Sequence, residues 1–261
     1  MNFKGLVKQI GALTTPNDGK SNLISNNIRS QVANFVMRNN LKSLVLGVSG
    51  GLDSACVASL CQQKYSGVPL IGVSIPINST DDSIEKSIFV CENYCDSFIV
   101  FNGWTDILNS ESESENQPSA YENLFYQLGL TDKVAEKNGF KIKKYPENIL
   151  HRDMKSRLRM LSLYDLAKKT NGMVLSANTL SKYNMGFWTK NGDVGDFEPI
   201  RNIGKGFELP SIAKNIGIRE DIITQSSSKE LIVNVSKEKD ITVNYKEIDT
   251  VMSVYLESCM M

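Results

Sequence analysis

Apolar residues in this chain form short runs that alternate with longer stretches in which apolar positions recur every three or four residues. The short runs are typical of strands covered on both faces, and the longer stretches are typical of amphipathic helices. The predicted strands cover 44–48, 68–75, 97–101 and 173–176. The predicted helices cover 21–39, 53–65, 80–94, 121–137, 151–170, 206–216, 219–224 and 244–257.

This alternation predicts an α/β fold, with a parallel sheet covered by helices on both faces. Ligands of such sheets bind where the strands end. We expect one domain over 1–261, with a loosely structured lead at 1–19 and a polar loop at 225–240. The acidic, serine-rich residues 110–119 predict a flexible surface insertion, and a binding role for this run is the alternative.

Two of the predicted helices have a recognisable buried face. In the first, an apolar residue recurs every four positions from Ile24 to Val36. The second begins at His151, and Asn171 with Gly172 would end it. Its buried side is expected to consist of Leu158, Leu161, Leu163, Leu166 and Ala167.

The first predicted strand runs into a glycine turn, and a helix follows at once. The first amides of a helix lack internal partners and carry partial positive charge, so they favour an anion. Glycines at 50 and 51 allow the backbone to approach a phosphate closely. The residues expected to bind it are Gly47, Val48, Ser49, Gly50, Gly51, Leu52, Asp53 and Ser54.

Asp53 changes the expected ligand, because a carboxylate repels a bare phosphate. Its presence suggests a divalent cation shared between Asp53 and the phosphates. The loop lacks the Gly-Lys-Ser/Thr of a Walker motif, and it is not the Gly-x-Gly-x-x-Gly dinucleotide fingerprint. The alternative is an ordinary glycine-rich turn between a strand and a helix.

Charge and hydropathy narrow the classes of partner. Lys and Arg together number 29 and Asp and Glu together number 29, so no net basic field favours a nucleic acid. No apolar run is long enough to cross a membrane, and the first residues lack a signal-peptide core. We therefore expect a cytoplasmic protein that binds neither nucleic acid nor membrane.

The cysteines and the single histidine argue against disulfides, a zinc site and a histidine-dependent hydrolase. Five cysteines, an odd number without extracellular features, indicate reduced thiols. Cys91 and Cys95 are expected to pack in the core, since one histidine in the chain makes a zinc site the weaker alternative. The same scarcity weakens a Ser-His or Cys-His hydrolase, because His151 is remote in sequence from Ser49.

Residues 49–54 resemble the pyrophosphate loop of the ATP pyrophosphatases, which cut ATP between its α and β phosphates and adenylylate a substrate oxygen. Arg157–Met160 and Gly186–Asp196 extend this resemblance to the ammonia-dependent NAD synthetases, over about 20–255. The resemblance implies a Rossmann-like fold of the adenine nucleotide alpha hydrolase type. It also implies a homodimer with the dinucleotide bound near the subunit interface.

The chemistry that the resemblance implies has a physical logic. Ammonia does not displace oxygen from the nicotinate carboxylate of deamido-NAD at a useful rate. Transfer of AMP from ATP makes a mixed anhydride, and ammonia then releases AMP and leaves the amide of NAD. Negative charge has to be stabilised on the pyrophosphate first and on the tetrahedral intermediate second. Mg²⁺ held by Asp53 suits the first task.

The resemblance also assigns roles to residues outside the loop. Lys190 would act on the phosphates or on the tetrahedral intermediate. Considered without the motif around it, Lys190 would be interpreted as a surface lysine. Lys205 and Ser228 match residues that contact the ATP phosphates, and Asp196 matches an acid at the nicotinate end. Arg157 is either an anion contact or a charge on the surface of a helix. Asp53, Lys190 and Ser228 are the predicted catalytic set.

Two positions depart from the family pattern. Ala177 stands where the family has a threonine that reaches ATP, and Lys182 stands where it has a glutamate that holds Mg²⁺. Either Lys182 contacts phosphate directly, or metal-assisted chemistry is impaired. A basic tail that contacts the dinucleotide is also not recognisable. The expected substrates remain ATP, deamido-NAD and ammonia; the alternatives are a nucleotide-binding relative without turnover and another adenylylating pyrophosphatase.

Overall fold

The fold is described from a computed structural model of the 261-residue chain. The structure describes residues 3–77, 79–104, 137, 147–224, 232–233, 241–242 and 244–260. The acidic run 110–119 and Ser228 lie outside the described residues. So does the helix expected over 121–137, apart from its last residue.

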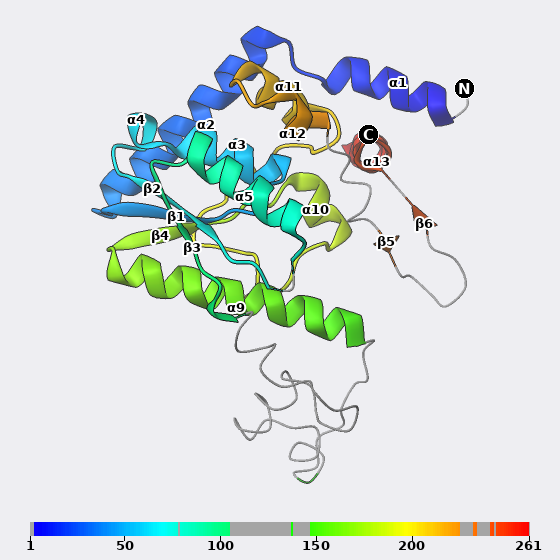
Figure 1. Cartoon of the computed structure of the whole chain (residues 1–261). Helices are drawn as coiled ribbons and strands as arrows, with labels where there is room; N and C mark the ends of the chain where they lie inside the picture. Colours follow the sequence, from blue (N-terminus) through cyan, green and yellow to red (C-terminus); the bar gives the residue numbers. More distant parts are fainter. Residues whose placement is uncertain are drawn as a thin grey trace.

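The centre of the structure is a four-stranded parallel sheet in the order β3-β2-β1-β4, which confirms the expected fold class (Figure 1). The strands are β1 (Ser43–Gly47), β2 (Leu70–Ser74), β3 (Ser97–Val100) and β4 (Gly172–Leu175). Leu44 of β1 is level with Leu70 on one side and with Met173 on the other. All four strands therefore end at the same edge of the sheet.

Helices connect and cover these strands. They are α1 (Phe3–Thr14), α2 (Asp18–Arg38), α3 (Leu52–Cys61), α4 (Gln63–Ser66), α5 (Asp81–Tyr94), α9 (Glu147–Lys169), α10 (Leu180–Met185), α11 (Glu208–Asn215), α12 (Glu220–Thr224) and α13 (Tyr245–Met260). The loop expected over 225–240 contains a short strand, β5 (Ile232–Val233), which pairs antiparallel with β6 (Ile241–Thr242). None of the helices described here combines the length and apolar content that a membrane crossing requires.

The two faces of the sheet pack against different helices, because successive side chains of a strand point in opposite directions. Leu44 and Leu46 of β1 join a core with α2, α3, α5 and α11. Val45, between them, joins a second core with Leu163 and Ala167 of α9. Figure 1 shows α9 on one side of the sheet and α2, α3, α5 and α11 on the other.

The predicted face of α2 is confirmed, whereas that of α9 is partly wrong. Ile28, Val32 and Val36 are all buried in the first core. On α9, Leu163 is buried, but Leu161 is 59% exposed. Two residues correspond to about 200° around a helix, so these two leucines point in nearly opposite directions.

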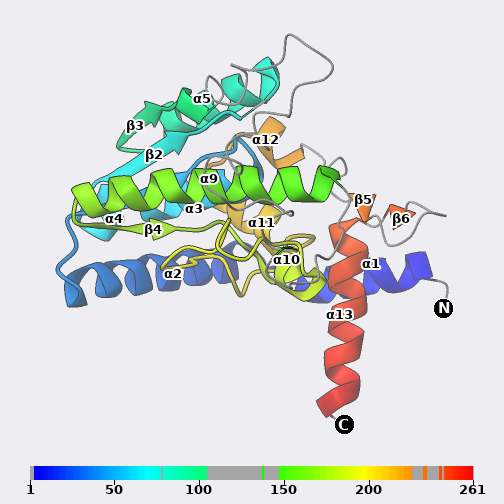
Figure 2. The same cartoon turned by 90° about the horizontal axis from the view of Figure 1, so that it is seen from below.

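Helix α1 occupies Phe3–Thr14, which corrects the loosely structured lead expected over 1–19. Helix α1 packs against α13 from the far end of the chain (Figure 2). Gly11 of α1 meets the ring of Phe207 closely, since a Cβ there would lie 2.6 Å from a ring carbon. The turn predicted at 14–19 does exist, and Asn17 caps α2 by accepting a hydrogen bond from the Lys20 amide. Helix α1 was missed because its contacts come from segments distant in sequence.

Four of the five cysteines lie in or against the core, and these include Cys91 and Cys95, as expected. Cys56, Cys61 and Cys91 are fully buried, and Cys95 packs against the same core. A Cβ at Gly72 would lie 2.6 Å from the sulfur of Cys95, so the thiols fit tightly against β2. Burial raises the pKa of the Cys61 thiol, which keeps it protonated and unreactive.

The burial pattern of α2 predicts unequal effects of two substitutions on one helix. Ile28→Ala should lower the free energy of unfolding by about 3 kcal/mol, because it leaves a cavity in the core. The matched control Leu23→Ala should change it by less than about 0.5 kcal/mol, since Leu23 is 61% exposed. Urea denaturation followed by circular dichroism measures both, and equal losses would contradict this orientation of α2.

Candidate functional site

The turn between β1 and α3 is shaped by its own glycines and hydroxyls. Gly50 has φ +80°, in the left-handed region that favours glycine. A Cβ at this position would also lie 2.7 Å from backbone atoms of Lys86 and Ser87 in α5. The hydroxyl of Ser54 donates to the Gly51 carbonyl at 3.0 Å and lies 3.3 Å from that of Ser49. Glycine is thus required at position 50 both by conformation and by space.

The first turn of α3 has the features of an anion site. Gly51 is the N-cap residue in an extended conformation, and it has no side chain that could accept a hydrogen bond from the amides that follow. Such amides have no partner within the helix and point along its positive end. They are therefore available to a ligand, as the sequence predicted for this loop.

Asp53, in that same turn, is buried between two lysines. Its Oδ2 atom lies 2.9 Å from the ammonium of Lys182 and 2.9 Å from the ammonium of Lys205. The other oxygen, Oδ1, is buried and accepts no hydrogen bond from the residues described. Burial acts to raise the pKa of Asp53, but the charges of Lys182 and Lys205 outweigh it and the pKa is lowered. The carboxyl group is therefore ionised at neutral pH.

Helix α13 anchors the backbone segments that carry both lysines. Asp249 of α13 accepts hydrogen bonds from the Ser181 hydroxyl and, at 2.7 Å, from the Gly206 amide. The Ser181 hydroxyl in turn accepts one from the Lys205 amide at 2.8 Å. Ser181 and Gly206 each adjoin one of the two lysines in sequence. One carboxylate thereby fixes the segments that carry both ammonium groups.

A cavity of about 390 Å³ opens where β1, β2 and β4 end. Gly47, Val48 and Ser49 of the predicted loop line it, and Lys182 reaches it from α10. Its other polar lining residues are Ser74, Ser79, Ser83, Ser87, Ser156, Arg159, Ser176, Asn178 and Asp193. Polar groups from several strand ends thus converge on one space, as is usual for ligand sites in parallel sheets.

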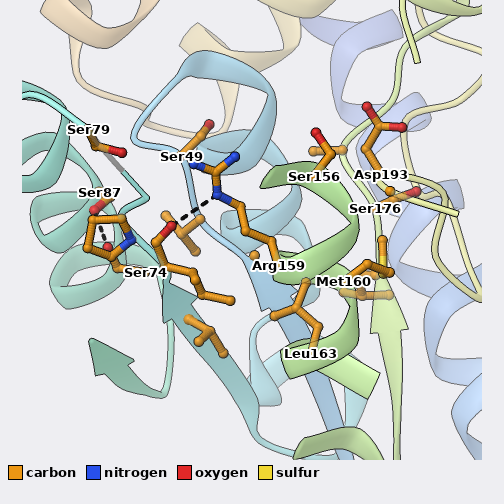
Figure 3. Close-up of a pocket in the computed structure, with 18 of the residues that line it drawn as sticks. Ser49, Ser74, Ser79, Ser87, Ser156, Arg159, Met160, Leu163, Ser176 and Asp193 are labelled. Carbon is orange, nitrogen blue, oxygen red and sulfur yellow. Dashed lines mark hydrogen bonds between the residues drawn. The ribbon is translucent and has the colours of Figure 1, made fainter. Parts of the chain in front are cut away.

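Arg159 is the cationic side chain that crosses this cavity from α9 (Figure 3). Its Nε atom donates to the Ile75 carbonyl at 3.0 Å, which orients the guanidinium. Burial lowers the pKa of Arg159 from its usual value, but a guanidinium remains charged at neutral pH. Arg159, Ser156 and Leu163 share the cavity face because they lie three and four residues apart.

A sequence model described as NAD synthase matches residues 24–260 of this chain. The chain belongs to the NAD synthase family. It is 29% identical over 234 residues to an NH₃-dependent NAD⁺ synthetase of Methanocaldococcus jannaschii, covering 89% of this chain and 80% of the relative. It is also 29% identical over 218 residues to the enzyme of that name from Thermococcus sibiricus, covering 83% and 74%.

Solved structures show the same fold. An NMN synthetase from Francisella tularensis superposes with a TM-score of 0.66 at 22% identity, over 90% of this chain and 86% of that one. An NH₃-dependent NAD synthetase from Campylobacter jejuni gives 0.65 at 19% identity, over 92% and 85%. The parallel α/β sheet predicted from the strand and helix pattern, and the Rossmann-like fold implied by the family resemblance, are therefore both in agreement with these structures.

Some of the residues predicted to form the site in this family member lie apart from the cavity. Arg157 and Lys190 are both exposed, and Arg157 Nε donates to the Lys190 carbonyl at 3.2 Å. Asp196 accepts hydrogen bonds from the Val174 amide at 2.9 Å and from the Tyr164 hydroxyl at 3.0 Å. Lys205 lies in the site through Asp53, whereas Ser228 is outside the described residues.

Sequence reasoning missed several lining residues of the NAD synthase site. Arg159 had a usable signal, because it lies four residues before Leu163 and so on the sheet-facing side of α9. Asp193 had a weaker one, within the segment Gly186–Asp196 that carried the family resemblance. Asn178 had none, since its amide is placed by the Glu198 carboxylate and the Asp193 carbonyl.

The turn at Gly50 predicts a position-specific loss of stability. Gly50→Ala should lower the free energy of unfolding by at least about 1–2 kcal/mol, because a left-handed φ and the α5 backbone both oppose a Cβ. The matched control Gly51→Ala should lower the free energy of unfolding by only a few tenths of that amount. At Gly51 φ is −86°, and the nearest atom to an added Cβ would be 3.6 Å away. Thermal unfolding of both variants checks this, and similar melting temperatures would refute it.

Proposed function

We propose that this chain makes NAD from deamido-NAD, ammonia and ATP. A carboxylate oxygen of the nicotinate attacks the α-phosphorus of ATP, and the bond to the β-phosphate oxygen breaks, which releases pyrophosphate. Ammonia then attacks the acyl carbon, loses a proton, and displaces AMP. The amide of NAD, AMP and pyrophosphate are the products.

The observation that carries this proposal is the position of the cavity within a member of the NAD synthase family. It lies at the strand ends, beside the turn 47–54, whose helix amides have no side-chain cap. Relatives that cover most of this chain are named NH₃-dependent NAD⁺ synthetases. Because Gly47, Val48 and Ser49 of this turn line the cavity, a triphosphate bound by the turn and an acceptor bound in the cavity would be neighbours.

The chain's own residues have distinct tasks in this reaction. The amides of 49–54 and the ammonium of Lys205 bind phosphate oxygens and stabilise the departing pyrophosphate. Arg159 draws an anionic group of the acceptor into the cavity. Lys190 acts on the phosphates or on the tetrahedral intermediate, and Ser228 contacts the ATP phosphates. Asp196 contacts the nicotinate end of deamido-NAD, and Arg157 contacts an anionic group. When magnesium is bound together with ATP, it would supply further neutralisation of the phosphate charge.

Two substitutions in the cavity wall favour a second candidate, a relative that binds ATP without turning it over. Ala177 and Lys182 both line the cavity. They replace the threonine and the acid that the family pattern implies at these positions, so this candidate retains ground-state binding of ATP and lacks one transition-state contact. A turnover assay separates the two candidates directly.

A homodimer is the proposed assembly. The exposed edge strand β3 presents Phe98 and Ile99, which are 41% and 43% exposed, and Leu161 of α9 adds a third apolar side chain. Ile99 and Leu161 share a mostly apolar hollow of about 470 Å³. An apolar surface beside β3, which is an edge strand of the sheet among the described residues, is suited to a second copy of the chain. The free thiols of Cys56, Cys61, Cys91 and Cys95 fit the proposed cytoplasmic location.

The proposed reaction predicts equal amounts of NAD, AMP and pyrophosphate from deamido-NAD, ammonium and MgATP. Lys205→Met should lower kcat/KM by about 100-fold, because an oriented ammonium on the phosphates is lost. The matched control Lys214→Met, an exposed lysine of α11, should leave the rate unchanged. Chromatographic separation of the three products measures all of these.

Other outcomes of this assay are equally informative. Nicotinate mononucleotide should be offered as a second acceptor, since a structural relative is named an NMN synthetase. If the mononucleotide is amidated faster than deamido-NAD, the mononucleotide is the substrate and the proposed acceptor is wrong. Tight binding of ATP without any product, over long incubation with both acceptors, would favour the non-catalytic candidate and contradict the proposed ligase.

The dimer proposal predicts a mass in solution of twice that of the chain. Leu161→Asp should shift the protein toward the monomer, because a charge would be buried against the apolar hollow. Lys168→Asp, on the same helix, is the control and should not shift it. Size-exclusion chromatography with light scattering gives the mass, and a monomeric wild-type protein at micromolar concentration would refute the dimer.

A further inference from the structure

The group formed by Asp53, Lys182 and Lys205 carries a net positive charge. Two ammonium groups share one oxygen of a single carboxylate, each at 2.9 Å. The side chain of Lys182 is 22% exposed and lines the cavity, whereas the side chains of Asp53 and Lys205 are each 8% exposed. The positive charge is therefore presented to the cavity chiefly by Lys182.

Asp53 does not fit the role of a magnesium ligand in this arrangement. Mg²⁺ requires oxygen ligands in octahedral geometry and retains several of its waters. Oδ2 is already engaged by two ammonium donors, and a divalent ion bound to it would lie beside two like charges. Oδ1 is closed to solvent, so a hydrated ion cannot reach it. Among the described residues, no group of three or more His, Cys, Asp or Glu side chains is placed to hold a metal.

Lys182 is built into a rigid position. Its carbonyl accepts a hydrogen bond from the Phe187 amide at 3.0 Å, at the end of α10 where Gly186 adopts φ +67°. The preceding residue, Ser181, is bound to Asp249 of α13. Its ammonium is aimed by Asp53. Backbone and side chain are thus both fixed, which reduces the entropy lost when an anion binds.

We propose that Lys182 serves as a tethered cation that replaces a protein-bound metal ion at this site, with Asp53 positioning Lys182 and Lys205 for the phosphates of ATP. This inference rests on the proposed function, because it takes ATP as the nucleotide. Any magnesium that accompanies ATP is then bound by the phosphates alone. Nucleotide affinity is consequently almost independent of magnesium, and the protein alone binds no divalent ion here.

The first experiment measures metal binding in the absence of nucleotide. Mn²⁺ is titrated into the wild-type chain and into Lys182→Glu, and bound Mn²⁺ is counted by electron paramagnetic resonance. The wild type should bind none at this site, whereas Lys182→Glu should bind one ion because two carboxylates then face each other. Adding Asp53→Asn to Lys182→Glu should abolish that ion. Stoichiometric Mn²⁺ on the wild type that Asp53→Asn removes would overturn the inference.

The second experiment measures the affinity for α,β-methylene-ATP by calorimetry, with Mg²⁺ and with EDTA. Wild-type affinity should differ by less than about threefold between the two conditions, while Lys182→Met should lose about tenfold or more in EDTA. Lys214→Met, outside the site, should behave as the wild type. Lys182→Met also covers the case in which Lys182→Glu does not fold. A wild-type loss of tenfold or more in EDTA would overturn the inference.

These outcomes separate the inference from the proposed function. NAD formation together with analogue binding that requires Mg²⁺ refutes the tethered cation and leaves the ligase standing. Analogue binding in EDTA without any NAD supports the tethered cation and refutes the ligase. Absence of analogue binding under both conditions refutes both.

Discussion

A buried carboxylate between two ammonium groups is the interaction on which the architecture of this site depends. Asp53 belongs to the turn after β1, Lys182 to the helix after β4, and Lys205 to the segment before α11. Charges removed from water are costly unless they are paired, and loss of one member of a buried pair typically costs about 3–5 kcal/mol. The buried charges therefore fix the positions of these three segments relative to one another, and the cavity at the strand ends keeps its shape.

The sheet makes this meeting possible without itself supplying the chemistry. Its strands alternate side chains between two cores, one with α9 and one with α2, α3, α5 and α11. Because all the strands are parallel, their polar ends gather at one edge. Arg159 comes to that edge from one layer of helices and the turn at Gly50 from the other. The cavity is thus enclosed by both layers.

Local patterns were sufficient to predict the parts of the fold that local physics determines. The apolar run 44–48, the glycine turn and the face of α2 are all read from neighbouring residues, and the structure has each of them. Helix α1 was missed because α13 and Phe207 support it from far along the chain. In the site, the family resemblance drew attention to Lys182, but nothing local in the sequence indicates that its ammonium meets Asp53.

Asp249 has a consequence for how the protein acquires its binding site. This residue of α13 holds both Ser181 and Gly206, yet it is synthesised after every strand of the sheet. The sheet and its helices can assemble while the ribosome is still adding residues, but the neighbours of both lysines gain their anchor only when α13 docks. Contacts that join such distant segments form late, since long loops must close first. Nascent chains would accordingly be compact before they are competent to bind nucleotide.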